Sequence, residues 1–280
     1  MTEYNRVNLI KKQITHFDPL QIAMSGQCFR WREPEDGCFL VPAFGSVLTI
    51  RRSGKDTFEF DCDEKTWNFI WCDYLDLHED YGRFSEAILA SEDDYLKGAY
   101  SLGSGIRILR QDLWETVVSF LISQNNNIPR IKKSIEALCT EFGEELRDGI
   151  YSFPTAERLS EAGTELSDKR FGLGYRDTYI REIAAYVCDH DTWLSDLKNM
   201  DHDAAYSELI KRTGIGPKVA NCICLFGLHH IDAFPVDTHV RQILDAHYSN
   251  GFDFKRYEGF AGVVQQYMFY AKQQGYVGKI

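Results

Sequence analysis

The chain has 280 residues, of which 44% are hydrophobic, enough for two domains or one large domain around a sizeable core. Its formal net charge of −11 excludes a basic surface over the whole molecule, although one basic face remains compatible with it. Eight scattered cysteines predict reduced thiols rather than a disulfide framework or a zinc cage.

No apolar run approaches the roughly 20 residues that a membrane-spanning helix needs. The first residues, MTEYNRVNLIKKQ, lack the long apolar stretch of a signal peptide. We therefore expect no membrane segment, and a location in the cytoplasm of a bacterium or the nucleus of a eukaryote.

The first 100 or so residues favour short strands separated by Gly, Pro and acidic turns. In the segment TFEFDC, Phe58, Phe60 and Cys62 alternate with acidic residues, as in a half-buried strand. This region predicts a small antiparallel sheet with strands at 28–31, 38–44, 46–52 and 57–62.

Helical periodicity dominates the rest of the chain. Helices are expected near 64–75, 83–100, 110–123, 128–142, 155–162, 176–189, 203–212, 217–227, 235–247 and 258–273. Ser and Gly punctuate the segment 101–112 before a strongly apolar helix, as at a domain boundary. The sequence thus predicts an α+β fold: an N-terminal domain (1–105) with a small antiparallel β-sheet, followed by an all-helical domain (106–280).

The segment 207–228 has the pattern of two helices joined by a tight turn. A helix ends near Arg212, Gly214-Ile215-Gly216 reverses the chain, and Pro217 suits the first turn of the next helix. The free backbone N–H groups of such a turn are good phosphate donors. The same pattern also occurs as a simple connector between helices.

Lys218 follows in the first helical turn, where the helix dipole opposes its charge, so it loses a proton more easily and can act as a nucleophile. An ordinary exposed lysine is the alternative. Asp237, in the segment FPVDTHV, is placed to cap a further helix. A capping carboxylate is also a fixed anion, which an oxocarbenium-like sugar transition state requires.

The hairpin GIGPKVANC followed by PVDTH resembles the helix–hairpin–helix DNA glycosylases, in which a hairpin lysine marks the bifunctional members. Within that superfamily the chain is most similar to the 8-oxoguanine DNA glycosylases. The segments SGQCFRW (25–31), SQNNNIPRI (123–131) and LGYRDTYI (173–180) carry this resemblance together with the hairpin. AGVVQQYMFYA (261–271) is more loosely similar, and the resemblance spans about residues 20–270.

The resemblance implies a role for each matching residue. Lys218 would attack C1′ and form a Schiff base, and Asp237 would stabilise the sugar cation. The Gly26 carbonyl would accept from N7–H of 8-oxoguanine, Cys222 and Phe269 would sandwich the flipped base, and Gln265 would bind its Watson–Crick edge. The remaining implied contacts are to the opposite cytosine (Asn125, Arg130, Arg176), to the base stack as a wedge (Tyr175) and to the DNA backbone (Gly214, Gly216, His239).

Taken alone, several of these residues also suit plain structural roles. The run 124–127 suits a solvated turn or helix cap, and Tyr175 and Arg176 beside Gly174 could cap a helix. The chain after the hairpin, which carries Gln265 and Phe269, is short.

The sequence predicts a monomeric base excision repair enzyme that excises 8-oxoguanine opposite cytosine from damaged duplex DNA and cleaves the abasic strand. No cofactor is expected, and a metal stays open. One alternative is a glycosylase for another modified purine, and a second is a non-catalytic module that grips the DNA backbone. The presence of Lys218 argues against an alkylpurine glycosylase, which usually lacks this lysine. The lack of cysteines after Cys224 argues against a member with a C-terminal iron–sulfur cluster. A purely binding hairpin has no use for both Lys218 and Asp237.

Overall fold

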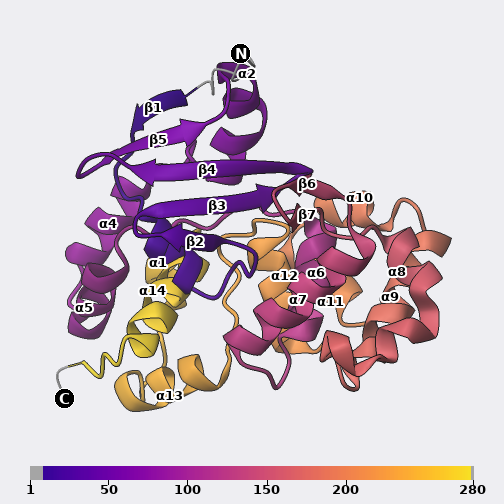
Figure 1. Cartoon of the computed structure of the whole chain (residues 1–280). Coiled ribbons are helices and arrows are strands. Elements are labelled where there is room, and N and C mark those ends of the chain that lie inside the picture. Colours follow the sequence, from indigo (N-terminus) through magenta and orange to yellow (C-terminus); the bar gives the residue numbers. More distant parts are fainter. Residues whose placement is uncertain (1–8, 279–280) are drawn as a thin grey trace, which may run out of the picture.

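A computed structural model describes residues 9–278, in which a sheet and its short helices lie above a larger helical part (Figure 1). The sheet is antiparallel, in the order β1-β5-β4-β3-β2. Its strands are β1 (Leu9–Gln13), β2 (Arg32–Glu35), β3 (Cys38–Ala43), β4 (Ser46–Arg52) and β5 (Thr57–Asp61). The predicted α+β class is confirmed. The helical part additionally contains a short hairpin, β6 (Glu145–Arg147) and β7 (Ile150–Tyr151).

The sheet forms because alternate residues of its central strands are apolar and face one core. Phe58 and Phe60 of β5 are fully buried, and Ile50 of β4 lies opposite Phe60. The expected strands at 38–44, 46–52 and 57–62 are confirmed within a residue or two. The expected strand at 28–31 is wrong: all four residues are buried in an irregular segment, so no outward face alternates. Strand β1 was not expected.

The helices of the N-terminal region are α1 (Pro19–Met24), α2 (Glu64–Thr66), a π-helical turn η1 (Trp67–Trp71), α3 (Cys72–Tyr74), α4 (Tyr81–Leu89) and α5 (Asp94–Gly103). The single helix expected at 83–100 is therefore two helices. The Ser91 hydroxyl turns back to the carbonyl of Ile88, and Asp93 then caps α5 by accepting from the amide of Leu96. These local side-chain bonds end one helix and start the next.

The larger part consists of α6 (Leu113–Ile122), α7 (Ile128–Phe142), α8 (Ala156–Ala162), α9 (Arg176–Asp189), α10 (Trp193–Lys198), α11 (His202–Leu209), α12 (Pro217–Phe226), α13 (Thr238–His247) and α14 (Ala261–Gln273), with 3-10 turns η2 (Gly163–Ser167), η3 (Lys169–Phe171) and η4 (Phe254–Tyr257). Most match the expected ranges closely, whereas α1 and α10 were not expected. Helix α6 packs on α12, and α14 packs on α5 and α13.

Two hydrophobic cores meet along the seam between the sheet and the helices. One core contains the sheet, α1, the two tryptophans of η1 and Tyr74 of α3, together with Leu109. The other contains the helical part and also the buried faces of α4 and α5. The boundary expected at 105/106 stays a prediction. Within these cores, α4 and α5 are N-terminal in sequence but pack with the C-terminal helices.

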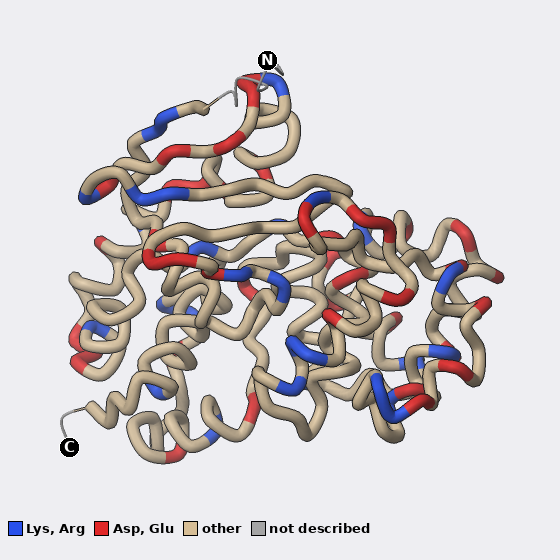
Figure 2. Tube along the Cα trace, viewed as in Figure 1, with Lys and Arg blue, Asp and Glu red and all other residues tan. Residues whose placement is uncertain are grey.

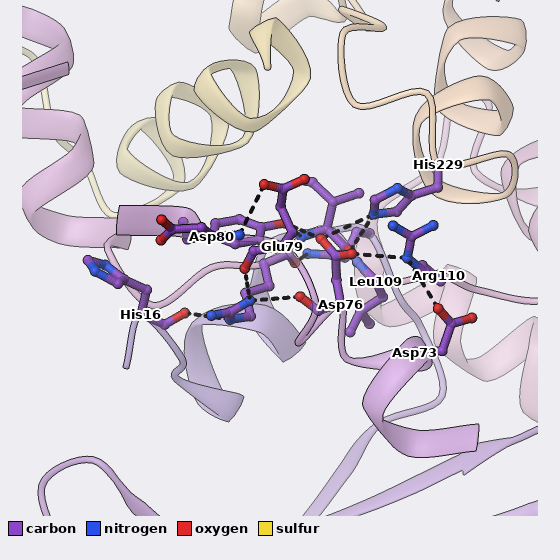
Figure 3. A network of polar contacts seen from close by, with 12 residues as sticks. His16, Asp73, Asp76, Glu79, Asp80, Leu109, Arg110 and His229 are labelled. Carbon is purple, nitrogen blue, oxygen red and sulfur yellow. Dashed lines mark hydrogen bonds and ion pairs between the residues drawn. The ribbon is translucent and has the colours of Figure 1, made fainter. Parts of the chain in front are cut away.

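A buried polar network joins the two parts at this seam (Figure 3). Asp76 is fully buried, and its carboxylate accepts from the hydroxyl of Tyr81 at 2.9 Å and from Nε of Arg110 at 3.0 Å. It also lies 3.2 Å from Nε2 of His229, in the loop after α12. Arg107 donates to the backbone carbonyl of Asp76 at 2.7 Å. Since a buried carboxylate needs such partners, the network fixes the loop that follows α12 against the N-terminal region.

Candidate active site

The hairpin between α11 and α12 has the geometry that its glycines suggested. Gly214 has a φ of +82°, and a Cβ there would lie 2.5 Å from ring atoms of Tyr179. Gly216 is the N-cap of α12 in extended conformation, with open space where a Cβ would stand. Ile215 is buried between them, and Pro217 begins the helix. Gly214 is thus required by conformation and close packing, whereas Gly216 leaves the helix N-terminus open.

Lys218 is half-buried in the first turn of α12 and points back toward the end of α6. Its Nζ lies 3.5 Å from Oγ of Ser123 and 5.2 Å from the ring centroid of Phe120. The Ser123 hydroxyl donates to the carbonyl of Phe120 at 2.8 Å, so its oxygen can only accept from Lys218. A ring face and one acceptor therefore hold the amine in place.

Cys222 lies one turn further along α12 than Lys218 and is buried. Burial raises the pKa of the Cys222 thiol, the charge of Lys218 and its hydrogen bond to the thiol lower that pKa, and the charge of Asp237 raises it. The charges of Lys218 and Asp237 thus act on this one buried sulfur in opposite directions. The thiol stays neutral and can serve as an apolar stacking surface.

Asp237 is the N-cap of α13, as the sequence predicted. Its Oδ1 accepts from the amide of Val240 at 2.8 Å. The cap fixes the carboxylate, and the side chain remains half-buried.

The structure brings Gly26 and Phe269 together from opposite ends of the chain. Gly26 follows α1 with a φ of +76°, and a Cβ there would lie 2.8 Å from Cε1 of Phe269. His239, in the first turn of α13, lies edge-on to the same ring at 6.1 Å between centroids. The contact is close enough that only glycine fits beside this ring.

Gln265 lies on α14 one turn before Phe269 and is 3% exposed. Its Nε2 donates to the backbone carbonyl of Pro235, in the loop before Asp237, at 3.0 Å. This bond connects α14 to the segment that carries the predicted catalytic carboxylate.

Asn125, Tyr175 and Arg176 form a second group of contacts. Nδ2 of Asn125 donates to the hydroxyl of the exposed Tyr175 at 3.3 Å, and Asn125 has a φ of +46°. Arg176 is 6% exposed and donates to the backbone carbonyls of Gln124, Asn125 and Leu173. Its guanidinium shapes the loop that carries Asn125, and lies over the Tyr175 ring.

Arg130 is different, because its side chain is exposed at the start of α7 and forms no hydrogen bond or ion pair within residues 9–278. Helix α7 carries a group of blue segments on the lower part of the molecule in Figure 2, whereas red segments crowd the β2–β3 turn and the turn between α4 and α5. The net charge of −11 therefore coexists with cationic residues on the hairpin side.

Two family models together match residues 9–257. Residues 9–117 match the 8-oxoguanine DNA glycosylase N-terminal domain, and residues 118–257 match the HhH-GPD superfamily of base excision DNA repair proteins. The chain belongs to the 8-oxoguanine DNA glycosylase family.

Relatives of this 8-oxoguanine DNA glycosylase family member agree. An N-glycosylase/DNA lyase of Saccharomyces cerevisiae is 40% identical over 158 residues, 51% of this chain and 42% of its own. One from Arabidopsis thaliana is 40% identical over 232 residues, 78% of this chain and 63% of its own. The chain thus spans about half the length of these two relatives.

Solved structures extend the similarity to the three-dimensional fold. The 8-oxoguanine glycosylase/lyase of Clostridium acetobutylicum, in complex with double-stranded DNA containing cytosine opposite 8-oxoG, is 33% identical with a TM-score of 0.86. The match covers 96% of this chain and 98% of that one. In the described part of this family member, no helix is long and apolar enough to cross a membrane.

Sequence reasoning missed several residues of this glycosylase-family site. Ser123 and Phe120 contact Lys218, Tyr179 packs under Gly214, and Gln266 donates to Gln265 at 3.0 Å. Ser123 stands at the start of the segment SQNNNIPRI, which was a usable signal. The others have no local pattern that separates them from core residues.

Proposed function

We propose that the protein is an 8-oxoguanine DNA glycosylase and abasic-site lyase acting on duplex DNA, preferentially opposite cytosine. The observation that carries this proposal is Lys218 in the first turn of α12, behind an open helix N-terminus and held 3.5 Å from Oγ of Ser123. Asp237, fixed as the N-cap of the next helix, supplies the anionic group. The similarity to the Clostridium acetobutylicum enzyme, whose structure contains DNA with cytosine opposite 8-oxoG, supports the substrate.

The chemistry follows from these groups. The neutral amine of Lys218 attacks C1′ of the extruded nucleotide, and the bond from C1′ to the base breaks, its electron pair leaving with the base, which takes up a proton. The Asp237 carboxylate stabilises the positive charge that develops on the sugar. The sugar ring then opens to a protonated Schiff base between Lys218 and C1′. Loss of a C2′ proton then expels the 3′ phosphate by β-elimination, and water releases the lysine.

The proposed base pocket lies where Gly26 and Phe269 meet. The carbonyl of Gly26 would accept from N7–H of 8-oxoguanine, a proton that guanine lacks, while the Phe269 ring and the Cys222 thiol would stack on the two faces of the base. Base stacking on aromatic groups contributes about 1–3 kcal/mol. Hydrogen-bond readout at N7 would discriminate the lesion from the normal base.

The proposed DNA contacts lie on the hairpin, at the start of α13, and at or just before the starts of α7 and α9. The open N-terminus of α12 at Gly216, with the turn at Gly214, would bind a phosphate through backbone N–H groups, and the exposed His239 would contact another. Tyr175 would act as a wedge in the base stack of the DNA. Asn125 and Arg130 would contact the orphaned cytosine. We expect the enzyme to act as a monomer.

Borohydride reduction during reaction tests the proposal directly. With a duplex containing 8-oxoguanine opposite cytosine, the protein is expected to become covalently joined to DNA, because reduction traps the Schiff base. Undamaged duplex is the control. Base release without trapping would contradict the Schiff-base route. Absence of both base release and trapping would contradict the proposed activity.

A further inference from the structure

Two consecutive glutamines in α14, Gln265 and Gln266, are both 3% exposed and hydrogen-bonded to each other. Nε2 of Gln265 donates to the carbonyl of Pro235 at 3.0 Å, and Nε2 of Gln266 donates to Oε1 of Gln265 at 3.0 Å. A backbone carbonyl can only accept, so Pro235 requires the nitrogen side of the Gln265 amide. Gln266 supplies the donor that the oxygen side requires.

These two bonds hold the Gln265 amide in one orientation while leaving it capacity for a ligand. The NH₂ group retains a second hydrogen, and the oxygen retains a second lone pair. The Watson–Crick edge of a guanine-type base places an acceptor, O6, beside a donor, N1–H. An adenine-type base places a donor, N6–H, beside an acceptor, N1. A fixed amide fits one of these patterns, and only an amide turned by 180° fits the other.

Gln266 has a feature that a residue serving only the core would not need. Its Oε1 is buried without a hydrogen-bond partner in the described part of the chain. An unpartnered buried oxygen destabilises a fold, so a hydrophobic side chain of similar volume would pack more favourably here. The amide is explained by the hydrogen bond that it gives to Gln265.

We propose that Gln266 is a positioning residue that strengthens guanine-type over adenine-type specificity, because it adds a second restraint, beside the Pro235 carbonyl, against rotation of the Gln265 amide. The proposal rests on the function proposed above, because Gln265 must face the Watson–Crick edge of the extruded base. Pro235 and Gln266 act from two sides, and only the second contact is made by a side chain that can be exchanged.

The test compares 8-oxoguanine with 8-oxoadenine, which share N7–H and the C8 carbonyl and differ at the Watson–Crick edge. Excision rates are measured in single turnover for wild type, Gln266→Leu and Gln266→Met. Losing one hydrogen bond at the amide is expected to lower the rate ratio of 8-oxoguanine to 8-oxoadenine about tenfold. The fall is expected in the 8-oxoguanine rate, while the 8-oxoadenine rate is unchanged or higher.

Two controls separate recognition from folding and from the proposed function itself. Gln274→Leu makes the same chemical change at the exposed end of α14 and is expected to leave the ratio unchanged. Borohydride trapping on a preformed abasic site needs no base in the pocket, so both Gln266 variants should retain it.

The possible outcomes distinguish failure of the positioning role of Gln266 from failure of the proposed function. An unchanged ratio in both variants overturns the positioning role, and so does an equal fall in both excision rates together with loss of abasic-site trapping. A wild-type protein that neither excises 8-oxoguanine nor is trapped contradicts the proposed function instead.

Discussion

Nζ of Lys218 lies 3.5 Å from Oγ of Ser123, so the second helix of the hairpin is connected to the end of α6 through the predicted nucleophile. The serine hydroxyl already donates a hydrogen bond to the carbonyl of Phe120, and the lysine lies over the Phe120 ring. Two contacts therefore hold the amino group of Lys218 at the end of α6.

Replacement of the lysine tests the nucleophile. Lys218→Gln is expected to abolish borohydride trapping and strand cleavage while duplex binding is largely retained, because the backbone donors of the hairpin stay in place. Glutamine can still donate to Ser123, so the fold should survive. Trapping gels and binding titrations measure the two effects.

Lys198→Gln provides the matched control, because Lys198 is exposed at the end of another helix, α10. It should be trapped like wild type. Trapping of Lys218→Gln at the wild-type level would show that another amine forms the adduct.

Asp237 should combine a structural role with an electrostatic one. Asp237→Asn is expected to slow base excision by about 10²–10³-fold, the usual effect of removing one preorganised charge-stabilising group. Asparagine caps helices about as well as aspartate, so the melting temperature should change little. Single-turnover excision and thermal unfolding are the two measurements.

Asp201→Asn is the control for the capping role. Asp201 caps α11 through the amide of Ala204 at 2.9 Å, so it carries the same substitution at an N-cap outside the site. Its excision rate should equal that of wild type. A normal rate in Asp237→Asn as well would leave Asp237 as a cap only.

Arg130 should determine the choice of opposite base. Its exposed guanidinium is free to donate to O2 and N3 of the orphaned cytosine, whereas the amino group of adenine would face another donor. An unmet polar group costs about 1–3 kcal/mol, so Arg130→Met should reduce the preference for cytosine roughly 10- to 100-fold. Excision opposite each of the four bases measures it.

Arg176 is the contrasting arginine, since its donors already serve the carbonyls of Gln124, Asn125 and Leu173. Arg176→Met should lower the melting temperature, whereas Arg130→Met should not. If Arg130→Met weakens binding to all duplexes uniformly and keeps their rank order, Arg130 binds phosphate instead.

Gly214 should be intolerant of any side chain. Gly214→Ala forces alanine into a left-handed conformation, at a cost of roughly 1–2 kcal/mol, and directs its Cβ into the ring of Tyr179. We expect lower stability and weaker duplex binding. Thermal unfolding and salt-dependent binding measure the two effects.

Gly216→Ala is the matched variant, because Gly216 is extended and open space surrounds its missing Cβ. It should keep wild-type stability and lose affinity only where the new methyl group hinders the phosphate. Equal melting temperatures for both variants would contradict the assigned role of the left-handed turn.

Local patterns in the sequence determined the hairpin, its proline start, the Asp237 cap and most helix ranges. These features depend on a few neighbouring residues: a left-handed glycine, a capping carboxylate and an apolar face repeating every three to four positions. The break at Ser91 and Asp93 was also local, but the apolar pattern of the two helices continued across it.

Only the tertiary structure decided which distant residues meet. Gly26 touches Phe269, Lys218 lies beside Ser123, and Gln266 fixes the amide of Gln265. The buried segment 28–31 and the sharing of the helical core by α4 and α5 were decided in the same way. Such contacts depend on how the helices and the sheet pack against one another. A local sequence pattern indicates which residues are buried, but it does not specify which distant residue each one contacts.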